Sequence, residues 1–181
     1  SLATLIRDDL GISNGIAGLI TTVPLLAFAL ASPIIPRISS RLGIGRTMLA
    51  GLILVLAGEC IRSYTNALGV YIGTAFMGVG IAAGNVLVPA IIKQRFPSRV
   101  GLLTSIYTTA MGIFAGIAAG ISVPLALDLG LGWRTSLAVW AVLTLITALV
   151  WLPQAREDAP AKRQQAAPTG IMRQLFHSPL A

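Results

Sequence analysis

Two groups of polar residues stand in otherwise apolar sequence, and their types define the chemistry that this chain could carry out. In the first group, Glu59 and Arg62 are three residues apart, a spacing that places both on one face of a helix, where they can pair. A structural ion pair is therefore expected. Because an ionisable group inside an apolar helix is a candidate for function, a proton-linked Glu59 is the alternative.

The second group is centred on Asn85, the one strongly polar side chain in the apolar stretch from Gly78 to Ile92. A carboxamide surrounded by hydrocarbon needs hydrogen-bond partners, so Asn85 must face other helices or a wet cavity. Bonding between helices and contact with a ligand are equally open interpretations.

Residues of other apolar runs are predicted to lie at the same depth as Asn85. Asn85 stands about five residues, or roughly 8 Å, from the centre of its helix. Side chains on one helix face recur every three or four positions, which groups the neighbours of Tyr107. A polar belt at one depth is what a binding site for a small solute would contain, and its predicted members are Asn85, Tyr107, Thr108, Thr104, Met111 and Ser32.

Other kinds of chemistry are poorly represented in the sequence. A single cysteine, Cys60, excludes an internal disulfide and a thiolate metal cluster, and the single histidine, His177, stands in a polar tail. We find no nucleophile–base pair and no phosphate-binding loop. We therefore expect no enzyme activity, no metal site and no cofactor.

The composition indicates an all-α integral membrane protein. Hydrophobic residues make up 55% of the chain and charged residues 10%, whereas soluble domains carry about 25% charged residues. The net charge of +7 does not indicate nucleic-acid binding, because the cations stand in small groups between apolar runs rather than on one solvated face. The expected partner is the lipid bilayer.

Charge-free windows predict a polytopic helical bundle over residues 1–152. A span of the hydrocarbon core needs about 20 apolar residues, and five windows meet or approach that length. Residues 153–181, rich in Gln, Ala, Pro and charge, are expected to be a cytoplasmic linker. The odd number of spans predicts that one helix precedes residue 1 and that further helices follow residue 181. The predicted spans are 15–35, 47–65, 68–92, 101–126 and 133–152.

The basic residues predict the orientation of the bundle, because cytoplasmic loops of membrane proteins are enriched in Lys and Arg. Arg7, Arg62 and Arg134 fall on one side, and ten cations fall on the other. Residue 1 is therefore expected outside the cytoplasm and residue 181 inside it. The ten are Arg37, Arg41, Arg46, Lys93, Arg95, Arg99, Arg156, Lys162, Arg163 and Arg173.

Glycines at intervals of four predict faces on which helices approach closely. The expected role is tight static packing, and the alternative is a smooth face on which two helix bundles rock. The glycines concerned are Gly69 with Gly73, Gly80 with Gly84, and the run Gly112, Gly116 and Gly120.

The connection after the first predicted span carries a family resemblance. Its sequence Arg41-Leu42-Gly43 followed by Arg46 resembles the loop signature of the major facilitator superfamily, between that family's second and third helices. The resemblance makes Arg41, Gly43 and Arg46 candidates for a gating loop. Pro36 and Ser40 stand where the family has a glycine and an acidic residue.

Further segments resemble the cyanate and nitroimidazole transporter branch of that superfamily. The resemblance implies that the five spans are helices two to six of a twelve-helix transporter in the bacterial inner membrane. It also implies proton-coupled movement of a small organic or pseudohalide solute by alternating access, with the missing C-terminal half of the same chain as partner. A membrane sensor or scaffold that binds a small ligand without moving it is the alternative. The segments are Gly84 to Pro89, Lys93 to Pro97, Tyr107-Thr108 with Met111, Gly132 to Arg134, and Trp151 to Gln154.

Overall fold

The structure, a computed structural model, describes residue 7 and residues 13–64, 66–127 and 132–157, and these form helices joined by short turns. The described part of the chain contains no strand. The helices in order are α2 (Asn14–Ala31), α3 (Ile35–Leu42), α4 (Ile44–Tyr64), α5 (Ala67–Arg95), the 3₁₀ turn η1 (Pro97–Arg99), α6 (Val100–Leu127) and α7 (Gly132–Glu157).

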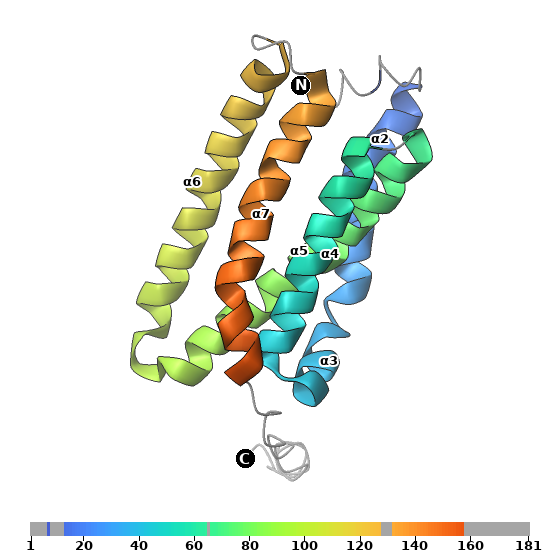
Figure 1. The fold of residues 1–181 in the computed structure, drawn as a ribbon. Coiled ribbons are helices and arrows are strands. Elements are labelled where there is room, and N and C mark those ends of the chain that lie inside the picture. The colour runs from blue at the N-terminus through green and yellow to red at the C-terminus, as the bar shows by residue number, and fades with distance from the viewer. Residues whose placement is uncertain (1–6, 8–12, 65, 128–131, 158–181) are drawn as a thin grey trace, which may run out of the picture.

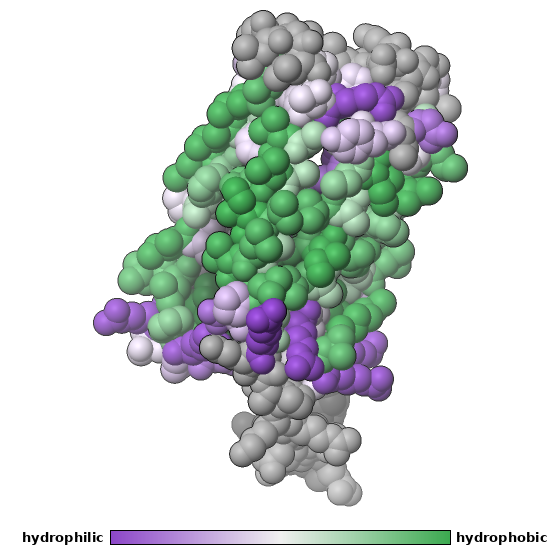
Figure 2. Space-filling view, in the orientation of Figure 1, coloured by the Kyte–Doolittle hydropathy of each residue, from purple (hydrophilic) through white to green (hydrophobic). Residues whose placement is uncertain are grey.

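The long helices run side by side as a bundle (Figure 1). The helix α4 packs against both α5 and α7, and α2 packs on α5, whereas α6 contacts α7 and, less extensively, α5. Figure 2 shows a hydrophobic band between two hydrophilic ends. Four of the described helices are long and apolar enough to span a membrane, and the bent pair α2 and α3 gives a fifth if the two helices together form one span. The predicted all-α membrane bundle is confirmed.

The end of the bundle at which α4 begins and α7 ends is called the basic end below. Arginines and lysines lie there in α3, at the start of α4, at the end of α5, in η1 and at the end of α7. Figure 2 shows these hydrophilic residues below the hydrophobic band. The arrangement follows from the alternating direction of successive long helices, which returns every second connection to the same end.

The boundaries of three predicted spans agree with α4, α5 and α6 to within three residues. The predicted span 133–152 is too short, because α7 continues through Pro153 to Glu157. Proline is tolerated in membrane helices, where neighbouring groups satisfy the carbonyl that the proline leaves free. The predicted linker therefore begins inside a helix, and its residues 158–181 lie outside the described residues.

The first predicted span, about 15–35, extends beyond the helix α2 at its C-terminal end. The helix α2 ends at Ala31 and a turn follows over residues 32–34. Pro33 has no N–H to donate and disfavours helical backbone in the residue before it. Pro36 sits at the first positions of α3, where proline is tolerated. The connection after the first predicted span is thus mainly the helix α3, which is bent by 54° from α2.

Glycine lets the backbones of α4 and α5 touch. A Cβ atom at Gly58 would meet the carbonyl oxygen of Gly73, and one at Gly73 would meet that of Gly58. Gly51 and Gly80 repeat this reciprocal arrangement nearer the basic end, where a Cβ at Gly51 would lie 2.6 Å from that of Ala83. The prediction of tight packing is confirmed for Gly73 and Gly80.

The described residues provide no such close approach at the other glycines of this prediction that can be compared. A Cβ at Gly84 would meet no atom of a neighbouring element within 4 Å. The three glycines of the predicted run in α6 are equally open, because α6 contacts the rest of the bundle at few points. They are Gly112, Gly116 and Gly120.

Candidate functional site

A hydrogen bond between α5 and α6 joins the two central residues of the predicted polar belt. The hydroxyl of Tyr107 donates to Oδ1 of Asn85 at 3.1 Å, and Nδ2 of Asn85 donates to the carbonyl oxygen of Ile81 at 3.2 Å. Both side chains are partly buried. The second bond holds the carboxamide against its own helix, so that Oδ1 points toward α6.

Proline 89 adds a second polar group at the same place. An α-helix bonds each N–H to the carbonyl four residues earlier, and Pro89, inside α5, has no N–H to give to the carbonyl of Asn85. Asn85 therefore contributes a side chain and a main-chain oxygen that lacks its usual helical partner. The proline and asparagine belong to one short segment, which is why a single stretch of sequence produces this feature.

Thr104, Thr108 and Met111 surround Tyr107 on α6. The hydroxyl of Thr108 donates to the carbonyl oxygens of Thr104 and Ser105, at 3.0 and 3.1 Å, so its proton is used within α6 while its oxygen can still accept. Met111 is 45% exposed. The Thr108 hydroxyl and the Met111 thioether are therefore exposed on α6, within four residues of Tyr107 in the sequence.

Ser32 is not joined to this group in the structure. It lies in the turn between α2 and α3, and its hydroxyl donates to the carbonyl oxygen of Phe28 at 2.5 Å. That bond satisfies the end of α2, where the last carbonyls lack helical partners. The sequence placed Ser32 at a similar depth, but depth alone does not determine which helices face each other.

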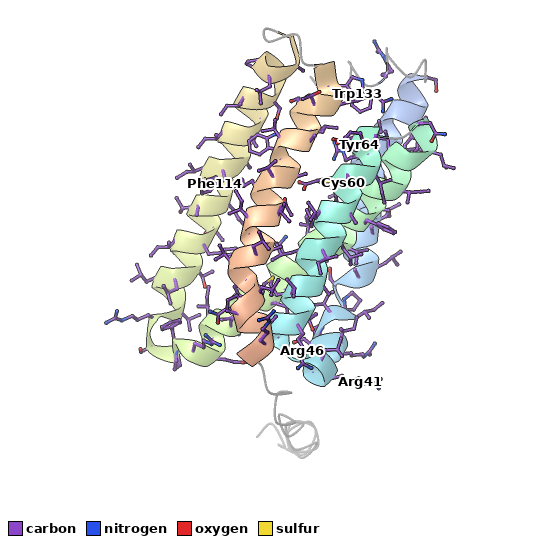
Figure 3. The ribbon with its side chains drawn as sticks, viewed as in Figure 1. Arg41, Arg46, Cys60, Tyr64, Phe114 and Trp133 are labelled. Atoms are coloured by element: carbon purple, nitrogen blue, oxygen red, sulfur yellow. The ribbon has the colours of Figure 1, made fainter. Side chains whose placement is uncertain are left out.

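The predicted gating loop is a joint between two helices. Gly43 has φ of +93°, a backbone conformation that favours glycine. Its N–H donates to the carbonyl of Ser39 at 2.9 Å, and its carbonyl accepts from the hydroxyl of Thr47 at 2.7 Å. Arg41 and Arg46 flank this joint, with exposed side chains at the basic end (Figure 3).

Glu59 and Arg62 lie in a polar cluster between α4, α5 and α7. The Glu59 side chain is only 7% exposed, and the Thr144 hydroxyl of α7 is hydrogen-bonded to its carboxylate. Arg62 interacts with Glu59 electrostatically, while its Nη1 donates to Sδ of Met77 on α5 at 3.2 Å. One buried atom on each side chain, Oε2 of Glu59 and Nε of Arg62, has no hydrogen-bond partner.

A second cation, Arg134, extends this polar cluster toward the end of the bundle opposite the basic end. Nη1 of Arg134 donates to the carbonyl oxygen of Ser63 at 3.3 Å. The guanidinium of Arg134 also lies 4.5 Å from the centre of the Trp133 ring, a cation–π contact. Sequence reasoning missed Met77 and Thr144 as partners of this cluster, because contacts between helices leave no spacing signal in a single sequence.

Serine 122 provides a second polar link to α6, well away from Tyr107. The buried hydroxyl of Ser136 on α7 donates to the carbonyl oxygen of Ser122 at 2.8 Å, and Nε1 of Trp140 donates to the Ser122 hydroxyl at 3.0 Å. These residues were not singled out from the sequence. Their signal is a serine in each of two apolar runs, which gains meaning only once α6 and α7 are known to be neighbours.

A metal centre is not formed by the part of the chain that the structure describes, in which no three His, Cys, Asp or Glu residues come together. The chemistry available is hydrogen bonding at Asn85 and Tyr107 and ionisable groups at Glu59 and Arg62. Together with the bundle of apolar helices, these features define a multi-pass membrane protein with polar groups inside its helix layer.

Comparison with known proteins identifies the family. The model of the Major Facilitator Superfamily matches residues 1–181, so the chain belongs to this superfamily. It is 46% identical over 158 residues to the uncharacterized transporter YycB of Bacillus subtilis (strain 168), covering 87% of this chain and 39% of that protein.

Two relatives from Escherichia coli (strain K12) carry names that state a solute. The chain is 39% identical over 180 residues to a 2-nitroimidazole transporter, which covers 99% of this chain and 45% of that protein. It is 27% identical over 173 residues to the cyanate transport protein CynX, which covers 92% of this chain and 44% of that protein. The resemblance to the cyanate and nitroimidazole branch is confirmed. The chain spans less than half the length of these curated relatives.

Proposed function

We propose that this chain forms the N-terminal part of a secondary active transporter of a small polar solute, of the cyanate-like or nitroaromatic class. Membership of the superfamily and the names of two relatives support the solute class. In this proposal the protein lies in the bacterial inner membrane with its basic end in the cytoplasm. Its second half supplies the other wall of the site, and the site alternates its access between the two sides.

The observation that carries the proposal is the hydrogen bond from Tyr107 to Asn85. At 3.1 Å it is longer than the typical O–H···O bond of about 2.7 to 2.8 Å, and both side chains are partly exposed. A solute with a nitro, imidazole or cyanate acceptor can accept the hydrogen bond that the Tyr107 hydroxyl donates to Asn85. Oδ1 of Asn85 is then free to accept a hydrogen bond from a solute N–H. With a solute that carries an N–H, as an imidazole ring does, both groups exchange one partner for another and neither is left unsatisfied. Cyanate has acceptors only, so it would engage the Tyr107 hydroxyl and not Oδ1 of Asn85.

Uptake measurements on the complete transporter test this site. Cells producing it are given labelled cyanate or labelled 2-nitroimidazole, and initial rates are compared for Asn85→Ala, Tyr107→Phe and the control Thr147→Ala. Thr147 is an exposed α7 residue whose hydroxyl bonds only its own helix, at Leu143. We expect each site variant to lower the uptake rate by about tenfold at equal membrane abundance, and the control to be unchanged.

Other results of this experiment would redirect the proposal. Lower abundance with normal transport per molecule would make Asn85 a packing residue. Binding of a solute to purified protein without flux into vesicles would favour the sensor or scaffold alternative.

Proton coupling is the second part of the proposal, and Glu59 is its candidate. The carboxylate is buried beside Arg62 and Thr144. Arg134 lies close by, because it donates to the carbonyl oxygen of Ser63, the residue after Arg62. The test is the pH dependence of uptake in Glu59→Gln, which keeps the shape of the side chain and removes its charge. A pH profile identical to that of the unmodified protein would remove Glu59 from the coupling mechanism.

A further inference from the structure

A groove between α4 and α7 opens at the basic end of the bundle. Its volume is about 400 Å³. Both helices contribute residues spaced three and four apart, so each wall is one continuous helix face. The lining residues are Arg46, Leu49, Ala50 and Ile53 from α4, and Leu152, Ala155 and Arg156 from α7.

The charged and apolar parts of this groove are separated along its length. Arg46 stands in the first turn of α4 and Arg156 in the last turn of α7, so both guanidinium groups lie where the helices leave the hydrophobic band. Leu49, Ile53 and Leu152 continue the groove into that band. Figure 3 shows Arg46 at the lower end of the bundle, where α7 also ends.

Two cations stand at the mouth of the groove, and the side chains that the structure describes bring no carboxylate to it, while Glu157 and Asp158 follow Arg156 in the sequence. Glu59 is the only carboxylate whose side chain the structure describes, and it follows Arg46 by thirteen residues along α4, or about 20 Å of helix. Arg46 and Arg156 are both exposed. Two adjacent cations at a membrane surface attract an anionic group.

The walls of the groove are held together beside it. Nε1 of Trp151 on α7 donates to the carbonyl oxygen of Gly45 on α4 at 3.1 Å. The Trp151 ring also packs against the buried cluster that contains Met48 and Leu87. The separation of α4 and α7 is therefore set by a hydrogen bond and by packing, and the groove is a fixed feature of this end of the bundle.

We propose that this groove binds an anionic phospholipid. The lipid phosphate lies between Arg46 and Arg156, since guanidinium groups bind phosphate oxygens in a bidentate fashion. One acyl chain lies along the apolar wall formed by Leu49, Ile53 and Leu152. Basic pockets between membrane helices are typical headgroup sites. The proposal depends on the membrane location of the chain and is independent of which solute is transported.

The same pair of helices supplies an internal comparison. A second hollow of about 310 Å³ lies between α4 and α7 in the other half of the bundle, near Cys60 and Tyr64. The described residues that line it include no cation, so this hollow offers no group that binds an anionic headgroup and serves as the uncharged comparison. The remaining lining residues are Leu56, Ser63, Ala138, Ala141, Val142 and Leu145.

Lipid binding to the complete transporter tests the proposal. The purified protein is mixed with defined amounts of phosphatidylglycerol or phosphatidylcholine, and bound lipid is counted by native mass spectrometry. The double variant Arg46→Gln/Arg156→Gln is compared with Lys93→Gln/Arg95→Gln, which removes the same charge at the basic end from exposed positions on α5. We expect the groove variant to lose about 30-fold in phosphatidylglycerol affinity, with phosphatidylcholine binding unchanged, and the control to stay within about twofold of the unmodified protein.

A second variant tests the apolar part without touching the charges. Ala50→Trp fills the groove, and Ala138→Trp fills the uncharged hollow as its control. Only Ala50→Trp is expected to lower phosphatidylglycerol binding. Equal losses in the two double charge variants would show a diffuse surface attraction and overturn the proposal. Displacement of the lipid by inorganic phosphate at millimolar concentration, with no effect of Ala50→Trp, would show a phosphate site instead and overturn it as well.

Discussion

Glycine occupies two different environments in this molecule. It lies in the close contact between α4 and α5, and it also lies on the open surface of α6. Gly58 and Gly73 bring two backbones into contact. Gly112 and Gly116 lie on an equally regular spacing in α6 and face open space. The spacing of small residues therefore shows where a close approach is possible, and the partner helix decides whether it happens.

The two regions also differ in what holds them in the bundle. Contacts along most of their length join α4 and α5, and these contacts are dispersive and close. The helix α6 is held by polar links at two separated points, Tyr107 with Asn85 and Ser122 with Ser136. Hydrogen bonds between membrane helices contribute only about 0.6 kcal/mol on average. We infer that α6 is the described helix that separates from the bundle at the lowest cost.

The largest expected effect is at the α4–α5 contact. Gly58→Leu places a side chain against the main-chain oxygen of Gly73, which cannot move aside without separating the helices. We expect a destabilisation of about 3 kcal/mol or more. Thermal unfolding of the purified 181-residue chain in detergent measures it, with Gly112→Leu as the matched control. Equal midpoints for the two variants would remove the distinction between the regions.

A smaller loss of stability is expected when the hydrogen bond between α6 and α7 is removed. Ser136→Ala removes the donor to the Ser122 carbonyl from a fully buried position. The expected loss is about 1 kcal/mol, toward the upper part of the range for hydrogen bonds between membrane helices. The rate of cleavage by protease near α6 reports it, because a freed helix opens more often. Thr147→Ala, whose hydroxyl bonds only its own helix, controls for loss of a hydroxyl.

The link at the other point of α6 is expected to be weaker. Tyr107→Phe removes one bond of 3.1 Å and keeps the aromatic ring, so stability falls by about 0.6 kcal/mol. A double-mutant cycle with Asn85→Ala measures the coupling free energy between the Tyr107 hydroxyl and the Asn85 side chain. A coupling energy near zero would mean that the two side chains meet without stabilising the contact, and it would leave the site proposal resting on flux data alone.

The smallest stability effect is expected at Gly116→Leu. Its side chain enters open space in this chain, so the midpoint should change by less than about 0.5 kcal/mol. The informative comparison is the same substitution in the complete transporter. A large loss of stability there would show that another part of the protein covers this face. Unchanged stability with lost uptake would favour a face on which helices slide.

The sequence was sufficient for the elements whose signal is local. Charge-free windows located α5 and α6 because the cost of a charge in hydrocarbon confines charges to the ends of spans. A shorter window, extended across Glu59 and Arg62, located α4. The helix α3 was missed because it is basic, follows Pro33 and contains Pro36 in its first turn, which are the signs of a turn. The extension of α7 was missed because Pro153 marks a boundary in water more reliably than in a membrane.

The candidate site shows the same division between local and distant signals. Alternating helix directions were enough to place Asn85 and Tyr107 at one depth, and the structure joins them. Depth was not enough to exclude Ser32, which bonds within α2. Thr144 and Met77 beside Glu59 and Arg62 depend on the rotation of α5 and α7 about their axes, which a single sequence does not specify.

The reciprocal contact of Gly58 and Gly73 restricts how this protein can change over generations. Every replacement of glycine adds at least one carbon atom, and here either added atom would collide with a main-chain oxygen of the opposite helix. A smaller residue on the opposite side cannot compensate, since the obstacle is a carbonyl that all amino acids share. Adaptive variation is therefore directed away from this contact and toward positions such as Gly116, where a new side chain meets open space.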